Sequence, residues 1–414
     1  MREKITYGTA FICLMFMGQF TQAQLLPIQY DTLPRSQEII FAGGADYAGS
    51  AIQSQLFSKF IFGGMITSDI KDASDARHKG LNRLGGVLYS DIEYRNYNIK
   101  PFKKRDWGMV FKTGYNAFGG GLYSDDAFGL VFYGNERYIG DTMSMSGMDL
   151  TFVSVQKIGV GCIDNISKSN VSINLYNMNN FTSGSFRDFE ISRSADGQDV
   201  TVVMDGELQM PNSTKFSQGI GLGVDIDFKL PVAWGNKNDQ TAYIQILAKN
   251  VGMAYLFEGQ KYYRIDTTIH FSGLQFSDLI GDNAILNDSI DMLATLGVSS
   301  EIRKRAVLLP GFIQVGKIVD VHQSKRLQSF FGIRLYPSII YSPYAYAGLH
   351  YKTTDWLSFG ANIGYGGFTN FRGGLYASMD IKKISLGLAS ENIVGLISKK
   401  GSGQSLYIRF KCAF

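Results

Sequence analysis

The chain has 414 residues, of which 40 are lysine or arginine and 36 are aspartate or glutamate, so its net charge is +4. No basic block interrupts this balance, and we therefore expect no nucleic acid partner, because binding to a phosphate backbone needs clustered cations. Glycine (47), phenylalanine (29) and tyrosine (23) are abundant while proline (8) is scarce, which favours strands, turns and aromatic residues at a membrane interface.

The N-terminal residues 1–23 have the pattern of a cleavable secretory signal. Arg2 and Lys4 precede a short apolar core at 10–17, and Thr21-Gln22-Ala23 fits a cleavage site. That core is shorter than the roughly 20 apolar residues of a membrane helix, and no run of 18 apolar residues follows it. We predict a signal at 1–23, a mature chain of residues 24–414, and no helical membrane domain.

Three later segments do not have the pattern of wall strands. Residues 68–83 are charged and predict a short helix or a loop. Residues 177–217 contain Asp-Gly and Pro-Asn pairs and predict an extended hairpin or a loop excursion. Residues 274–296 have apolar positions at mixed helical spacing. Each such segment could cover the mouth of a barrel or enter its lumen as a plug.

The middle of the chain alternates strictly between apolar and polar positions. From Ile220 to Leu230 the apolar residues alternate with glycines and then with Asp225, Asp227 and Lys229. A soluble core could not bury the apolar face without leaving the opposite face charged, whereas a membrane strand has an apolar outside and a polar inside. Residues 242–248 repeat the pattern, and weaker strand candidates are 84–97, 109–117, 127–134 and 171–175.

The C-terminal part predicts a meander of about six strands, at 331–335, 345–351, 357–365, 375–381, 384–388 and 406–414. In the last strand apolar residues alternate with Arg409 and Lys411, and the chain stops on Phe414. A final strand that ends in phenylalanine resembles the recognition signal of bacterial outer-membrane barrels. We therefore predict an all-β fold, a transmembrane antiparallel β-barrel of about 14 strands with a possible lumenal plug or loop helix. A soluble periplasmic β-protein is the alternative, and cell fractionation distinguishes the two.

The runs GIGLGVDIDFKL, TAYIQILAKNVGMAYLFEGQKYYRID and ISLGLASENIVGLISKKGSGQSLYIRFKCAF together resemble an uncharacterised family of outer-membrane β-barrels. That family is related in pattern to the fatty-acid transporter barrels and to the barrel proteins of type IX secretion. The resemblance covers roughly 219–414 and implies a 14-stranded barrel with a polar lumen and a plug. It carries over no catalytic residue, and residues 24–37 do not match the transporters' N-terminal hatch.

Charged and polar residues of the alternating strands are the candidate lumen-facing groups: Asp225, Asp227, Arg334, His350, Ser358, Arg409 and Lys411. We expect Asp225 and Asp227 to pair with lumen cations such as Arg334, Arg409 and Lys411. Two carboxylates are too few for a metal site. The remaining histidines are isolated, without zinc-ligand spacing, so we expect neither metal nor cofactor.

His350 and Ser358 raise the possibility of a barrel hydrolase. If Thr353-Thr354-Asp355 forms a three-residue turn, His350 lies opposite Ser358 on the inward face, where an imidazole could activate the hydroxyl. No acidic or amide residue is placed to orient that imidazole. We favour a polar lumen contact and a protein that is not an enzyme.

Two functions fit these patterns better. The first is transport of, or a channel for, a small and possibly hydrophobic molecule. The second is a non-transporting scaffold or accessory of a secretion or surface-motility assembly. In both cases the expected partners are outer-membrane lipid and the barrel-assembly machinery, and in the second also secretion-system subunits.

Overall fold

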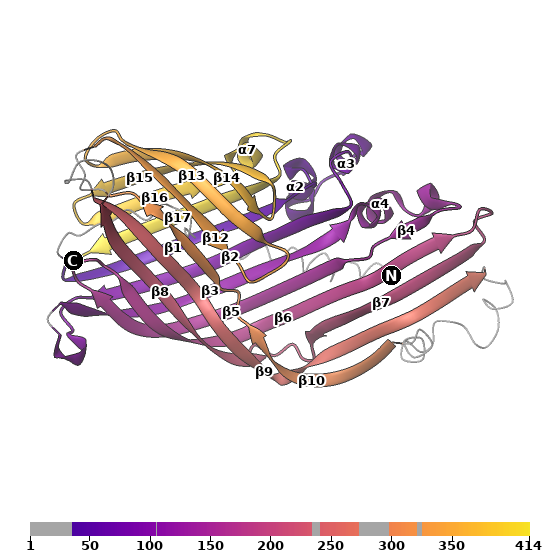
Figure 1. Ribbon diagram of the computed structural model, residues 1–414, viewed down its shortest axis with the longest axis horizontal. Coiled ribbons are helices and arrows are strands. Elements are labelled where there is room, and N and C mark those ends of the chain that lie inside the picture. The colour runs from indigo at the N-terminus through magenta and orange to yellow at the C-terminus, as the bar shows by residue number, and fades with distance from the viewer. Residues whose placement is uncertain (1–34, 105, 234–240, 273–297, 321–324) are drawn as a thin grey trace.

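The computed structural model describes residues 35–104, 106–233, 241–272, 298–320 and 325–414. The predicted signal at 1–23 and the segment 274–296 lie outside the described residues. The strands form one antiparallel sheet that closes on itself, because β1 (Gln37–Gly49) pairs with β2 (Leu81–Asn96) on one side and with β17 (Gly403–Ala413) on the other (Figure 1). The predicted β-barrel is confirmed.

Fourteen strands make the closed wall, as the sequence predicts. Between β2 and β17 they are β3 (Trp107–Ser124), β5 (Met148–Asp164), β6 (Asn170–Arg193), β8 (Gly219–Ala233), β9 (Thr241–Ser272), β11 (Phe312–Ile318), β12 (Leu327–Leu335), β13 (Ser342–Lys352), β14 (Leu357–Gly367), β15 (Phe371–Ile381) and β16 (Ile384–Ser390).

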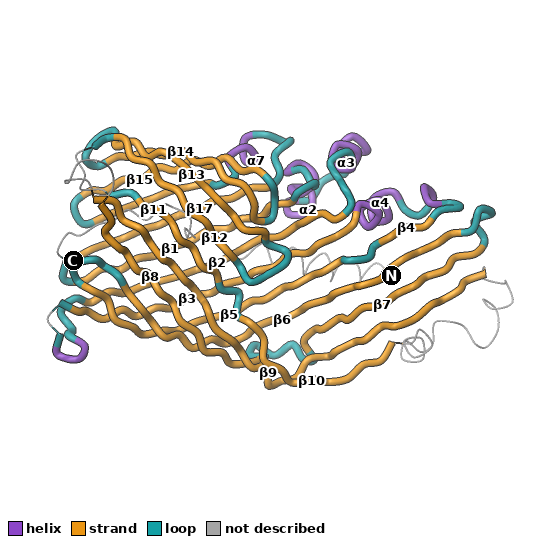
Figure 2. The backbone as a smooth tube through the Cα atoms, in the orientation of Figure 1, coloured by secondary structure: helices purple, strands orange, loops and turns teal. Residues whose placement is uncertain are grey.

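Three further strands extend the wall beyond the barrel: β4 (Thr142–Ser144), β7 (Asp199–Pro211) and β10 (Val298–Leu308). Residues 170–178 of β6 pair with β8, whereas residues 183–193 pair with β7. Likewise, β9 pairs with β8 along its first half and with β7 from residue 260 on. We call β4, β7, β10 and residues 183–193 and 260–272 the ribbon. In Figure 2 it projects away from the end that holds the C-terminus.

The segment 177–217, predicted to be an extended hairpin or a loop excursion, is an extended hairpin, which confirms the first alternative, while its description as non-strand is wrong. It contains the second half of β6, a turn at 194–198, and β7. The Asp-Gly pairs that suggested a loop do not interrupt it: Gly197 has φ +74° and makes the turn, while Gly206 lies within β7 opposite Phe186. Glycine and aspartate can therefore lie within an antiparallel strand when their neighbours pair on both sides.

The two ends of the barrel differ in their connections. At the terminal end, Gln37 and Phe414 exchange backbone hydrogen bonds, η1 (Pro101–Lys103) follows β2, and the turns 165–169, 353–356 and 382–383 are short. The opposite, far end holds α2 (Ser54–Phe62), α3 (Ser68–Asp75), α4 (Asp125–Tyr133), η2 (Glu136–Tyr138) and α7 (Ile393–Ile397) (Figure 1). Within the described residues, no helix is long and apolar enough to cross a membrane.

Two helices bear on the sequence predictions. The charged segment 68–83 contains α3 before β2 begins at Leu81, which is the short helix that its composition allows. The predicted weak strand 127–134 is wrong, because these residues belong to α4. The Ser124 hydroxyl accepts a hydrogen bond from the Ala127 N–H, and Gly134, with φ +77°, ends the helix. Its N-terminal cap and acidic first turn outweigh the apolar run that suggested a strand.

The outer surface of the wall is apolar and the inner surface is polar. In β8, Ile220 and Leu222 are each 58% exposed, whereas Asp225 and Asp227 point inward and are buried. In the same way, β17 presents Leu406 and Phe410 outward and Arg409 and Lys411 inward. The alternation predicted for these strands therefore has the predicted orientation, and it concentrates the charges in the interior.

Candidate functional site

Five charged side chains from five strands meet in the middle of the barrel. The Lys157 ammonium lies 3.3 Å from both Asp91 and Asp225, Lys112 lies 3.5 Å from Asp225, and Lys249 lies 3.2 Å from Asp91. We call these five residues the central ion network. They come from β2, β3, β5, β8 and β9, and Asp225 is only 1% exposed, so the network joins separate parts of the wall.

A β-bulge in β9 organises this network. The register between β8 and β9 shifts between Val224 and Ile226, and Asn250 has φ +53°. Asparagine is one of the few residues that adopt this left-handed conformation readily. The bulge frees the Asn250 N–H from the strand ladder, and it donates a hydrogen bond of 2.8 Å to Asp225. Bulges are known for redirecting side chains in this way.

The side chain of Asn250 completes the network. Its Oδ1 accepts hydrogen bonds from Lys157 (3.0 Å) and from the Tyr176 hydroxyl (3.1 Å). Its Nδ2 donates to Asn116 Oδ1 at 3.1 Å. The Asn250 side chain therefore connects Lys157 of β5 to the amide of β3 and to the tyrosine of β6, so one side chain contacts three other strands.

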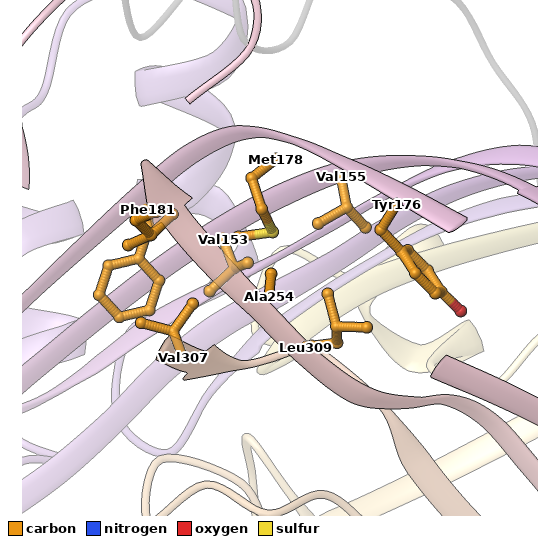
Figure 3. Close-up of a cluster of buried hydrophobic side chains, with 9 residues drawn as sticks. Val153, Val155, Tyr176, Met178, Phe181, Ala254, Val307 and Leu309 are labelled. Atoms are coloured by element: carbon orange, nitrogen blue, oxygen red, sulfur yellow. The ribbon is translucent and has the colours of Figure 1, made fainter. Parts of the chain in front are cut away.

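Apolar side chains fill the interior next to the network, toward the far end. One cluster includes Val153, Met178, Phe181 and Leu256, and Tyr176 joins it to Asn250 (Figure 3). A second cluster brings opposite walls into contact: the ring of Phe118 on β3 lies 5.3 Å from the ring of Tyr336 and 5.7 Å from that of Phe368. The lumen is therefore constricted by side chains of its own wall.

A second ion cluster lies nearer the far end. Arg372, whose side chain is fully buried, contacts Asp46 at 2.6 Å and Glu391 at 3.8 Å. Arg334 contacts the same Glu391 at 3.3 Å and donates to Gln314 at 2.9 Å. Arg334 faces the lumen as predicted, but its carboxylate partner is Glu391 and not Asp225 or Asp227, because the register of β12 places it closer to the far end.

A cavity of about 430 Å³ opens on the terminal-end side of the network. We call it the vestibule, and Asp225, Lys112 and Lys249 form part of its inner boundary. Small residues of the wall, including Ala42, Ser378 and Gly387, leave this space unfilled. Eleven cationic side chains line it, namely Arg35, Arg95, Lys112, Lys168, Lys229, Lys249, Lys352, Lys382, Lys383, Arg409 and Lys411, against six acidic ones, namely Glu38, Glu93, Asp225, Asp227, Asp355 and Asp380.

The predicted aspartates are neutralised by lysines of neighbouring strands. Asp225 contacts Lys112 and Lys157. Asp227 contacts Lys229 at 2.8 Å and accepts a hydrogen bond from Gln245 at 2.7 Å. Charge pairing inside the barrel thus occurs, but through cations that the prediction did not name. Arg409 and Lys411 line the vestibule, as does Asp227.

His350 and Ser358 both face the interior, but the predicted pairing is wrong by two residues. His350 lies opposite Gly360, and Ser358 lies opposite Lys352. Five residues, 353–357, lie between the paired Lys352 and Ser358, two more than in the predicted turn, and the N–H groups of Thr353 and Thr354 both donate to the Leu357 carbonyl. The nearest hydrogen-bond partner of the His350 imidazole is the Tyr376 hydroxyl, 2.7 Å from Nδ1.

Sequence reasoning missed several residues of the network. Asp91 could have been found, because the run from Ser90 to Asn96 alternates Ile92 and Tyr94 with Asp91, Glu93 and Arg95 just as β8 does. Lys157 shares its strand face with two valines, Val153 and Val155, and so carries no such signal. The described residues contain no group of three or more His, Cys, Asp or Glu side chains that could hold a metal ion.

No protein-family model matches the sequence, and no curated protein matches it. Among solved structures, the chain is similar to the toluene transporter TodX of P. putida, at 9% identity over 92% of this chain and 91% of that one, with a TM-score of 0.37. It is also similar to the translocator domain of the autotransporter NalP from Neisseria meningitidis (6% identity, 100% and 96% coverage, TM-score 0.27). A third is the transport unit of the autotransporter AIDA-I from Escherichia coli (9%, 99% and 97%, TM-score 0.25). All three are β-barrels, and the barrel assignment here rests on the strand register of this chain itself.

Proposed function

We propose that this protein is an outer-membrane β-barrel that moves a small molecule through its interior. Its outward apolar side chains support insertion in lipid, since a soluble protein rarely exposes so many large apolar groups on adjoining strands. Examples are Ile158, Ile173 and Ile363, each about 60% exposed. The short turns and the chain end face the periplasm in this proposal, and the helices and the ribbon face outward.

One observation carries the transport proposal: the vestibule leads to a constriction built of ion pairs and amides. Salt-bridged side chains can separate and hydrate, whereas the apolar clusters next to the network would have to lose packing contacts to open. The Lys249–Asp91 pair joins β9 to β2, which are not neighbours in the wall. We propose that the central ion network is the closed state of a gate.

Several further points belong to the same proposal. The solute is small and partly apolar, because Ile40, Leu247 and Tyr376 contribute apolar surface to the vestibule. The sequence also resembles transport-related barrels, and this resemblance favours transport by analogy of fold. We propose that the protein is not an enzyme, that it contacts outer-membrane lipid, and that the final strand with Phe414 is recognised by the barrel-assembly machinery.

Solute uptake by liposomes tests the gate. In the double variant Asp91→Ala/Lys249→Ala, both partners of one cross-wall pair are shortened together, so no orphaned charge is left between them. We expect faster osmotic swelling with small sugars and amino acids than for the native barrel. The matched control, Arg187→Ala/Asp205→Ala, removes an ion pair of 3.0 Å in the ribbon, away from the vestibule, and should swell at the native rate. Equal swelling of all three barrels would overturn the transport proposal.

The ribbon favours a second candidate, a scaffold or accessory of a secretion or motility assembly. Its strands carry exposed polar side chains, among them Arg264, Asp266 and His270 of β9, and its length is not needed to close the barrel. A variant that shortens the β6–β7 hairpin tests this candidate. Loss of a co-purifying secretion subunit from the variant, with liposome swelling unchanged in both proteins, would favour the scaffold.

A further inference from the structure

We infer that the vestibule binds the anionic group of a small organic molecule, and that Arg409 is its principal contact. This inference deepens the proposed function by naming the class of solute, and it rests on that function for its role in transport. It rests on three features of the vestibule: an excess of cations, a cation that has no ion-pair partner among the described residues, and open space beside that cation.

Five of the six carboxylates of the vestibule contact other cations, and the sixth, Asp380, accepts a hydrogen bond from the Ser378 hydroxyl. Glu38 and Glu93 both contact Arg95, at 3.5 Å and 2.5 Å. Asp227 contacts Lys229, and Asp355 contacts Lys352. The eleven cations that line the space therefore outnumber the six carboxylates, and the excess positive charge attracts an anion from solution.

Arg409 is the cation best placed to receive that anion. Among the described residues, no carboxylate lies within 4 Å of its guanidinium, in contrast to Arg95. Arg409 stands on a strand, half-buried, so its position is fixed by the wall. Guanidinium presents a planar fork of N–H donors that matches a carboxylate or a phosphate.

The neighbours of Arg409 leave room for a ligand. In the strand register Arg409 lies between Ala42 of β1 and Gly387 of β16, and neither side chain can fill the adjoining space. The cavity of about 430 Å³ falls in the usual size range of small-molecule sites. Ile40 and Leu247 supply apolar surface for the rest of the molecule. The shared chemistry is a carboxylate or phosphate on a short apolar body.

Trp356 lines the vestibule and reports on binding. The chain has three tryptophans, so Trp107→Phe and Trp234→Phe leave Trp356 as the only one. The purified full-length barrel in neutral detergent is titrated with hexanoate, hexyl phosphate and hexanol. We expect saturable fluorescence changes with the two anions and none with the neutral alcohol. Equal responses to hexanol and hexanoate would overturn the inference.

Substitution of the arginine tests its role. Arg409→Gln should weaken hexanoate binding about tenfold or more, as expected for loss of a charge-assisted hydrogen bond, and Arg409→Lys should weaken it less. The control Arg187→Gln removes the same charge from the ribbon, where the side chain is 76% exposed, and should bind normally. Unaltered affinity in Arg409→Gln would refute the assignment. Heat-modifiable electrophoretic mobility checks that each variant is folded, and Arg409→Lys serves if Arg409→Gln does not fold.

Two sources of anion are separated by competition. If the site takes a lipid head group, an anionic phospholipid added to the micelles displaces hexanoate at lower concentration than hexyl phosphate does. If it takes a free solute, the phospholipid does not compete. Both results support an anion site. Anion binding without any swelling of Asp91→Ala/Lys249→Ala liposomes would reject transport alone, whereas swelling without anion binding would reject this inference alone.

Discussion

Replacement of Asp225 by asparagine is the most direct test of the central ion network. The substitution preserves the shape of the side chain and an oxygen that can accept the hydrogen bond from the Asn250 N–H, 2.8 Å away. It removes the negative charge between Lys157 (3.3 Å) and Lys112 (3.5 Å). The perturbation is therefore electrostatic and leaves the packing intact.

The expected loss of stability is large. At an effective dielectric constant of about 20, unit charges about 3.4 Å apart attract by roughly 5 kcal/mol. The lysines keep part of their stabilisation after the substitution. Lys157 still contacts Asp91 and Asn250, and Lys112 still donates to the amide of Asn170 at 3.1 Å. Breaking a buried pair by removing one partner typically costs about 3–5 kcal/mol, and we expect Asp225→Asn to lower the free energy of unfolding by about that amount.

Urea unfolding of the barrel in lipid vesicles, followed by tryptophan fluorescence, measures this free energy. The double variant Asp225→Asn/Lys157→Met removes one charge of each sign, so we expect it to be more stable than Asp225→Asn alone. Asp355→Asn, which neutralises a carboxylate with a 99% exposed side chain, should leave the unfolding midpoint unchanged. A cost below about 1 kcal/mol for Asp225→Asn would show that the network is hydrated and contributes little, which would refute the reasoning.

Three further outcomes are expected. Gly85→Ala would place a Cβ 2.2 Å from the Phe368 ring and 2.9 Å from a backbone oxygen, so it should reduce the yield of refolded barrel. In the control Gly373→Ala, the nearest atom to the added Cβ is 4.0 Å away, and this variant should refold normally. Asn250→Ala should lower the free energy of unfolding by about 2–4 kcal/mol, since it adds left-handed strain and orphans buried partners, and Asn250→Gly should recover the strain component; equal losses would contradict this. Burial lowers the pKa of His78, so the folded protein favours the neutral imidazole. The stabilisation that His78 gives to the packing of α3 is therefore complete above the unfolded pKa of about 6.5 and is lost as the pH falls below that value. Limited proteolysis of residues 63–80 should therefore accelerate from pH 7.5 to about pH 5.5, and a His78→Phe variant should show no such pH dependence.

The wall of the barrel could be predicted from the sequence because period-two alternation is a local property. The residues from Ile220 to Leu230 and from Leu406 to Phe414 specify which face is apolar without reference to any other strand. The same local pattern places Asp225, Asp227, Arg409 and Lys411 inside the barrel, which is where the structure has them.

What could not be predicted depends on register and on contacts between distant strands. Two additional residues between the paired positions, Trp356 and Leu357, move Ser358 away from His350 and opposite Lys352. The bulge at Asn250 is a register shift between β8 and β9, and it depends on the pairing of two strands, which the local sequence pattern does not predict. The pairing of Lys157 with Asp225 and Asp91 joins strands far apart in sequence, so it follows from closure of the barrel and from no local pattern.

The continuity of β9 links the ribbon to the interior. This strand runs without a break for 32 residues, and Asn250 lies within its wall portion while its last residues belong to the ribbon. At about 3.3 Å per residue, the tip of the strand is roughly 70 Å from the bulge. A load applied at that tip acts along a single hydrogen-bonded chain segment on Asn250, the residue that holds Asp225 and Lys157 together. A force on the ribbon is thus transmitted along β9 to the central ion network.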